Sequence, residues 1–412
     1  MNRLRKYRIL LCSILFLDLV AIGLIFYVKV AGMVPDSIFT VVGEMDEVDF
    51  SLPIEISESV EALNIKNTDS GFRMNSKTEG SYDVEVRLFG LISLKKMNVK
   101  VISQQKVAPC GETAGIYVKS DGLLVLGTDA VEGTNGFRYE PVHNIVKPGD
   151  YIKEWNGETV TRISQLKKMI EKNGDKESRL MIIRDGERIT VAVTPVKGLD
   201  GKYKLGVWVR EDTQGIGTIT YLAQDGTFGA LGHGITDVDT GKLMESCQGE
   251  LYTAEILNIV KGTKGKPGEL EGMINMSFSE TIGVLKKNTP LGIFGEVDEQ
   301  YSNLLADQYM PIALKQEIKK GKAVIRTRIN GKKRDYEIEI EEIDMTSSDN
   351  KGMVIHVTDK KLLDRTGGIV QGMSGSPILQ GGKVIGAVTH VLVDDSTRGY
   401  GIFIENMLSA AQ

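Results

Sequence analysis

The sequence has few cysteines and no excess of positive charge. Only three cysteines occur in 412 residues, and Cys12 lies within an apolar run, which leaves Cys110 and Cys247 outside it. Two cysteines do not form a disulfide framework. The formal net charge of -5 gives no reason to expect nucleic-acid binding. Aromatic residues make up 6% of the chain, whereas glycine occurs 46 times, which is typical of a turn-rich β protein with room for two or three domains.

The amino-terminal segment combines a basic flank with a long apolar run. Four basic residues precede the apolar residues 9–28: Arg3, Arg5, Lys6 and Arg8. The run is long enough to cross a bilayer as a helix, and the basic flank should stay in the cytoplasm, so the rest of the chain is exported. A cleaved signal peptide is the alternative, but Lys29 occupies the position three residues before a cut after Ala31. We therefore predict a transmembrane anchor within residues 1–35.

Two further segments precede the carboxyl-terminal half. Residues 36–104 alternate in short strand-like runs without a chemical motif, which predicts a small β module or stalk. Residues 105–197 combine strands, an Asn156–Gly157 hairpin turn and a helix that Ser164 is expected to cap. This second stretch, with "KPGDYIKEWNG" and "RDGE", resembles a protease-associated PDZ domain.

The resemblance to a PDZ domain implies a peptide-binding groove. PDZ domains add an extended peptide to a sheet edge and hold its carboxylate with backbone amides of a glycine-rich loop. The candidate loop is "GLLVLG", which consists of Gly122, Leu123, Leu124, Val125, Leu126 and Gly127. A β-rich spacer without a ligand is the alternative.

Residues 198–412 again consist of short strands and turns. Hairpin turns are expected at Asp225–Gly226 and Asn330–Gly331. Such a pattern over this length is typical of a double β-barrel or a sandwich. The fold class that we predict is mainly β, with a PDZ-like domain followed by a chymotrypsin-like double barrel.

The segment "GMSGSPILQGGKVIGAVTH" contains the candidate nucleophile, Ser374. A serine needs a base within hydrogen-bond reach and donors for the developing oxyanion. Glycines on both sides permit a tight turn, which can aim the amides of Gly372 and Ser374 at one point. The segment resembles the nucleophile turn of chymotrypsin-like serine peptidases, although Met373 replaces their usual acid. Ser376 is the rival, but it precedes Pro377 and suits a strand entry.

The base must be one of four histidines. His233 lies between Gly232 and Gly234 in "GALGHGITD", where glycines give exposure and close backbone approach. His390, at the end of the strand after Ser374, is the main rival. His143 falls in the PDZ-like segment, and His356 lies in an alternating strand.

The residues alone do not decide which aspartate is the acid of the triad. The candidates are Asp359, Asp364 and Asp237. Two other kinds of site do not fit. "DVDTG" has no third acidic ligand before its glycine, and Gln248 stands where a calcium loop has its twelfth-position glutamate. No metal or cofactor is expected. Cys247, the partner that a cysteine peptidase would require for His233, has no basic neighbour that would lower its pKa.

The whole arrangement resembles the stage IV sporulation protein B peptidases of endospore-forming bacteria. The resemblance rests on "GHGITD" and "GGIVQGMSGSPI" together with the apolar span and the PDZ-like segment. It implies that Ser374 is the nucleophile, His233 the base and Asp359 the acid. It also implies a serine endopeptidase of the forespore inner membrane, with its carboxyl-terminal domains in the intermembrane space.

The resemblance further implies a signalling role. Such a peptidase cuts itself, then cuts the regulatory subunit of a membrane-embedded metalloprotease complex and so activates a late sporulation sigma factor. A catalytically inert, membrane-tethered PDZ adaptor is the alternative, and an intact serine–histidine pair favours the peptidase.

Overall fold

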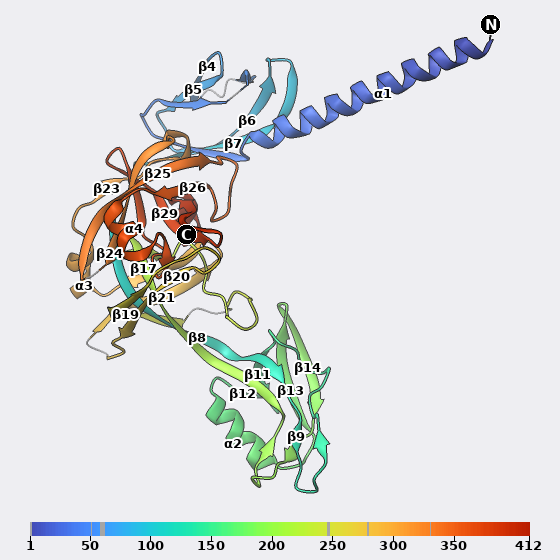
Figure 1. Cartoon of the computed structure of the whole chain (residues 1–412), viewed down its shortest axis with the longest axis vertical. Coiled ribbons are helices and arrows are strands. Elements are labelled where there is room, and N and C mark those ends of the chain that lie inside the picture. The colour runs from blue at the N-terminus through green and yellow to red at the C-terminus, as the bar shows by residue number, and fades with distance from the viewer. Residues whose placement is uncertain (1, 51, 58–61, 245–247, 278–279, 330) are drawn as a thin grey trace.

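The computed structural model describes residues 2–412 except 51, 58–61, 245–247, 278–279 and 330. Cys247 and the Asn330 half of the predicted Asn330–Gly331 turn therefore lie outside the described residues. Helix α1 (Asn2–Met33) extends away from the rest of the chain (Figure 1). Its most apolar 18-residue stretch has a mean hydropathy of 2.8, and the helix is long and apolar enough to cross a membrane.

Residues after α1 form a folded β module. Its strands are β1 (Ser37–Val41), β2 (Asp46–Asp49), β3 (Ile54–Ile56), β4 (Leu63–Asn67), β5 (Gly71–Ser76), β6 (Gly80–Leu88) and β7 (Ile92–Ile102). They pair in two sheets, β1-β7-β6-β3 and β2-β5-β4, around one apolar core. Val30 in the last turn of α1 and Val34 directly after the helix are buried in that core. Gln316 donates to the Phe39 carbonyl at 2.7 Å, so the module also contacts the carboxyl-terminal domain.

The first barrel closes through long-range strand pairing. Its strands are β8 (Lys106–Thr128), β17 (Val207–Ala223), β18 (Thr227–Ala230), β19 (Gln248–Val260), β21 (Thr281–Thr289) and β22 (Gly292–Val297). They pair in the order β8-β17-β18-β22-β21-β19, and the β19–β8 pairing closes the ring. Strand β20 (Gly268–Ile274) pairs with β19 outside the ring. The predicted turn at Asp225 joins β17 to β18, with Thr227 donating to the Asp225 carboxylate.

The second barrel repeats the same strand order. Its strands are β24 (Gly321–Ile329), β25 (Lys332–Ile343), β26 (Met353–Val357), β28 (Pro377–Gln380), β29 (Lys383–Leu392) and β30 (Asp395–Phe403). They close as β24-β25-β26-β30-β29-β28. In both rings the strands, numbered along the chain, follow the order 1-2-3-6-5-4. The smaller elements are α3 (Glu299–Leu305), β23 (Met310–Pro311), the 3₁₀ turn η2 (Lys315–Glu317), α4 (Lys360–Thr366), β27 (Val370–Gln371) and α5 (Ile404–Ala411).

The PDZ-like unit is inserted between the first two strands of the first barrel. It contains β9 (Val131–Glu132), β10 (Arg138–Tyr139), β11 (Tyr151–Trp155), β12 (Glu158–Thr159), α2 (Ile163–Asn173), β13 (Ser178–Arg184), β14 (Glu187–Val193), β15 (Val196–Lys197) and β16 (Tyr203–Lys204). Helix α2 starts at Ile163, one residue before Ser164, and the side chain of Gln165 accepts from the Thr161 and Arg162 amides. Ser164 is therefore inside the first turn and is not the predicted cap.

Strands β8 and β17 are shared by the two units. The first part of β8 packs in the first barrel through Ala108 and Ile116, whereas Leu123 and Val125 pack in the core of the PDZ-like unit. Figure 1 shows β8 running from the barrel into that unit. The chain therefore passes between the units within β8 and β17, not at residues 105 and 198. The predicted fold class is confirmed: a mainly β chain with an apolar amino-terminal helix, a PDZ-like unit and a double barrel.

Candidate active site

Ser374 lies in a tight turn between β27 and β28. Gly372 and Gly375 have φ of +98° and +93°, which side chains rarely adopt. A Cβ atom at Gly375 would lie 2.1 Å from the Thr218 carbonyl oxygen, so the turn requires glycine there. Thr218 binds the turn from β17, because its hydroxyl donates to the Gly372 carbonyl at 2.8 Å and its amide to the Ser374 carbonyl at 3.0 Å.

The backbone of this turn leaves two donors free. Within the described part of the chain, the amides of Gly372 and Ser374 have no hydrogen-bond acceptor. The neighbouring amides of Met373 and Gly375 donate to the carbonyls of Val370 and Val388. Two free amides on either side of a nucleophile can stabilise an oxyanion.

The two serines of the turn have different surroundings. The half-buried Ser374 hydroxyl donates to the Thr389 carbonyl at 2.7 Å. Ser376 is fully buried, and its hydroxyl has no partner among the described residues. A buried hydroxyl cannot meet a peptide substrate, which favours Ser374 as nucleophile.

His233 follows β18 on a loop with two residues of positive φ. Leu231 and Gly232 both have φ of +68°, and a Cβ atom at Gly234 would lie 2.5 Å from the Thr289 carbonyl. His233 Nδ1 lies 2.9 Å from the Gly234 carbonyl oxygen. A carbonyl only accepts, so Nδ1 carries the proton and the neutral ring has its free lone pair on Nε2. That is the protonation state of a general base.

Asn288, in β21, fixes the loop that follows His233. Its amide group accepts from the Ile235 amide at 2.8 Å and donates to the carbonyls of Ile235 and Met244 at 2.9 and 3.1 Å. No local sequence pattern marks this role or those of Thr218 and Thr389, because all three residues act through contacts between separate strands.

His390 lies beside His233. The ring centroids are 4.9 Å apart, with an angle of 37° between the planes. Burial lowers the pKa of His233, and burial together with the charge of His233 lowers the pKa of His390 to about 4. Both rings are therefore neutral at pH 7.

Ser374, His233 and His390 line one cavity of about 770 Å³. Strands of the first barrel and the turn and strand ends of the second barrel contribute to it. Apolar side chains complete part of the wall: Ile116, Val118, Ile216, Ile235 and Val391. The cavity can accommodate several residues of an extended peptide.

The lowered pKa of His233 predicts the acid limb of the pH profile. Burial disfavours the charged ring, so protonation that inactivates the base requires a pH below the ordinary value of 6.5. We expect kcat/KM on a peptide substrate to be constant through pH 7 and to fall only below pH 6.5. A profile whose acid limb is centred above pH 7 would contradict this environment.

The structure does not bring the three candidate acids to His233. Asp359 caps helix α4, where its carboxylate accepts from the Leu362 amide at 3.0 Å. Asp364 lines a separate cavity with Arg334, Tyr336 and Lys361. None of the three aspartates lines the cavity of Ser374. The Nδ1–H of His233 donates its hydrogen bond to the Gly234 carbonyl instead of to a carboxylate.

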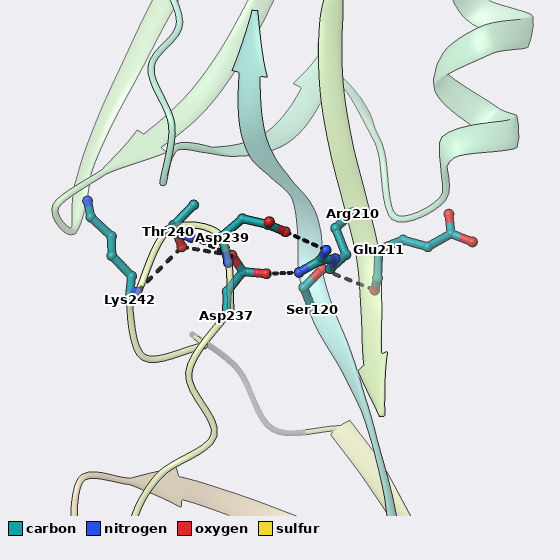
Figure 2. Close-up of polar contacts among 7 residues, drawn as sticks. All are labelled: Ser120, Arg210, Glu211, Asp237, Asp239, Thr240 and Lys242. Carbon is teal, nitrogen blue, oxygen red and sulfur yellow. Dashed lines mark hydrogen bonds and ion pairs between the residues drawn. The ribbon is translucent and has the colours of Figure 1, made fainter. Parts of the chain in front are cut away.

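Asp237 takes part in a contact with the PDZ-like unit. Its carboxylate is 1% exposed, is ion-paired with Arg210 and accepts from the Thr240 amide at 2.8 Å (Figure 2). Arg210 also binds Asp239, and Lys242 binds Asp185 of the PDZ-like unit at 2.8 Å. Residues 237–242 thus join the loop of His233 to the inserted unit.

Substitutions of Asp359 separate a capping role from a catalytic one. We expect Asp359→Asn to keep turnover within about tenfold, because asparagine also caps a helix, and Asp359→Ala to lower stability by about 1 kcal/mol. Thermal unfolding and peptide turnover of both variants test this. If Asp359→Asn unfolds normally yet loses about 10⁴-fold in rate, its carboxylate does orient the base, as the family resemblance implies.

Two other histidines and one cysteine lie away from this cavity. His143 is beside Glu140 on the surface of the PDZ-like unit, and His356 is 3.5 Å from Glu341 on the second barrel. Cys110 is buried, which raises the pKa of its thiol to about 12. The described residues contain no group of three or more histidine, cysteine or acidic side chains that could hold a metal.

The predicted peptide-binding loop is part of a sheet. Residues 122–127 belong to β8, where Leu123 and Leu124 pair with β11 on one side, and Leu124, Val125 and Gly127 pair with β17 on the other. Leu123, Leu124 and Val125 are fully buried. Since both edges are occupied, this segment cannot hold a peptide carboxylate as an open loop. The glycine-rich composition was misleading because the strand is long and continuous.

Comparisons with known proteins identify the family. A family model described as SpoIVB peptidase S55 matches residues 201–408, about half of the chain. The chain belongs to the SpoIVB peptidase family. This is a family of serine peptidases, so the protein is a serine peptidase, and the matched region contains Ser374 and His233.

Two other comparisons do not extend the family assignment. No curated protein matches the chain. Among solved structures, the chain is similar to the PDZ domain of an SdrC-like protein from Listeria monocytogenes, with 14% identity and a TM-score of 0.18. That similarity covers 22% of this chain and 87% of the other.

Proposed function

We propose that this SpoIVB peptidase is an endopeptidase in which Ser374 attacks the scissile carbonyl and His233 takes the hydroxyl proton. The observation that carries the proposal is one cavity that contains a half-buried serine, two free amides in its turn and a neutral histidine. The hydroxyl must leave the Thr389 carbonyl to reach His233, and such rearrangements are common when substrate binds. The Gly372 and Ser374 amides then receive the oxyanion.

We also propose that the protein acts on protein substrates at a membrane. The apolar helix anchors it in the forespore inner membrane, and the folded domains lie in the intermembrane space. Its substrates are the chain itself and the regulatory subunit of a membrane-embedded metalloprotease complex. Cleavage of that subunit frees the complex to activate a late sporulation sigma factor. The family match and the length of α1 support this pathway.

Self-cleavage is expected between α1 and the first barrel. Residues 103–105 connect β7 to β8, and Ser103, Gln104 and the first residue of β8, Lys106, are exposed there. Strand pairing protects most of the module upstream, and exposed connections are preferred sites of proteolysis. A tethered segment also has a local concentration in roughly the millimolar range, so weak recognition suffices.

Purified full-length protein tests this directly. We expect the wild-type chain to shorten with time to a new amino terminus between Pro35 and Val107, and Ser374→Ala to stay full length. A fluorophosphonate probe should label the wild-type protein and Ser376→Ala but not Ser374→Ala. Trimming of Ser374→Ala at the same position and rate would exclude self-cleavage. Absence of labelling in the wild-type protein would favour the inert adaptor.

A further inference from the structure

The turn between β6 and β7 exposes three large apolar side chains. Phe89, Leu91 and Ile92 are 55%, 84% and 50% exposed. The turn segment "LFGLIS", residues 88–93, contains no charged residue. Contiguous exposed apolar side chains mark a surface that meets something other than water.

The backbone of this turn is also unusual for a surface hairpin. Leu88 pairs with Ile92, and the Leu91 amide donates to the Leu88 carbonyl at 3.1 Å. Phe89 has φ of +53°, a left-handed conformation that is costly for a bulky residue. Asparagine, aspartate or glycine is the ordinary residue at such a position. The turn therefore keeps a phenylalanine at the tip at a cost in backbone strain.

The hairpin runs alongside α1 towards its apolar part. At the start of this contact, Lys95 binds Asp36 at 2.7 Å. Further back along both elements, the Tyr27 hydroxyl donates to the Ser93 and Leu94 carbonyls at 3.2 and 3.1 Å. The step from Lys95 back to Ser93 in β7 therefore runs beside the step from Asp36, which follows α1, back to Tyr27 within the helix. The two segments extend in the same direction. Figure 1 shows β6 and β7 next to the base of the helix.

The tip continues in that direction past Tyr27. The apolar run of α1 ends at Val28, so Tyr27 lies at the outer end of the span, where tyrosines are enriched at membrane–water interfaces. Three residues of strand from Leu94 to Leu91 extend up to about 10 Å further. This distance corresponds to about two turns of helix, which places the tip level with residues inside the span.

We propose that the β6–β7 turn, with Phe89, Leu91 and Ile92, inserts into the lipid bilayer beside α1. The occupant of this apolar surface is lipid, because the surface is continuous with the outer end of a helix that is itself exposed and apolar. The inference rests on the proposed membrane anchorage. Helix and hairpin then form two attachment points, which fix the orientation of the β module relative to the membrane. The barrels are held in turn through the contact of Phe39 with Gln316.

Quenching by brominated lipids tests the insertion. Leu91→Trp and the matched control Leu199→Trp are compared in full-length Ser374→Ala protein, so that self-cleavage cannot remove the anchor. Leu199 is 65% exposed in the PDZ-like unit, and the native Trp155 and Trp208 give both variants the same background. The proteins are reconstituted into phosphatidylcholine vesicles with or without bromine on the acyl chains.

We expect Leu91→Trp to show a blue-shifted emission and a loss of the added fluorescence in brominated vesicles. Leu199→Trp should be quenched no more than the parent protein. Equal quenching of both variants in protein that floats with the vesicles would overturn the hairpin insertion alone. A blue shift without quenching would mean that protein covers the tip, and would also overturn it. Failure of all the proteins to float would overturn the anchorage, and the insertion with it.

Discussion

Ser374→Ala is expected to lower peptide turnover by roughly 10⁴-fold or more, with little change in KM. The alanine removes the only atom that forms a covalent bond with the substrate, while the free amides of the turn and the cavity stay in place. Residual rate above water is expected from these amides and from substrate binding. Thermal unfolding should change little, because the half-buried hydroxyl makes one hydrogen bond within the described part of the chain, to the Thr389 carbonyl.

Ser376→Ala is the matched control for this substitution. Its buried hydroxyl has no partner among the described residues, so removing it removes an unsatisfied polar atom and should leave stability equal or higher. Turnover should be unchanged. Full activity in Ser374→Ala with loss in Ser376→Ala would transfer the nucleophile to Ser376, and would require the turn to open.

The catalytic turn could be predicted from sequence because its signal is local. Gly372, Ser374 and Gly375 adjoin one another, and the need for positive φ at glycine is a property of single residues. The same is true of His233 between its glycines and of the long apolar helix. Each of these features is decided by residues within a few positions of it.

The errors came from pairing over long distances. "GLLVLG" has the composition of a loop, but β11 and β17 pair with both of its edges. Hydrophobic periodicity could not show that β8 and β17 each belong to two units, because polar residues interrupt both strands where they pass from one core to the other, at 119–121 and 210–214. Such interruptions are typical of turns between separate strands, and they conceal the insertion of the PDZ-like unit.

The acid was the least predictable part of the site for a related reason. An aspartate at a strand end can cap a helix, form an ion pair or orient a base, and its neighbours in sequence do not distinguish these roles. In the structure Asp359 caps α4 and Asp237 binds Arg210. Main-chain groups take up part of the orienting role, since the Gly234 carbonyl binds His233 Nδ1 and Asn288 holds the loop behind it.

His233→Ala is expected to reduce turnover about as much as Ser374→Ala, because serine at neutral pH is a poor nucleophile without its base. The loss should fall on kcat. Combining the two substitutions should cost little beyond either one, since both act in the same proton transfer. Labelling of Ser374 by a fluorophosphonate should disappear in the histidine variant even though the serine is present.

His390→Gln distinguishes the base from its neighbour. His390 has a pKa of about 4, which makes it a weak base, whereas the His233 ring donates its Nδ1 proton to the Gly234 carbonyl and keeps its lone pair on Nε2. Glutamine keeps a polar side chain against the His233 ring, so we expect less than about a tenfold loss of kcat/KM, a small cost beside the 10²–10⁴-fold that a general base supplies. Steady-state kinetics of the two variants on one peptide substrate measure both effects. If His390→Gln loses almost all activity and His233→Ala keeps most of the rate, His390 is the base and His233 is not.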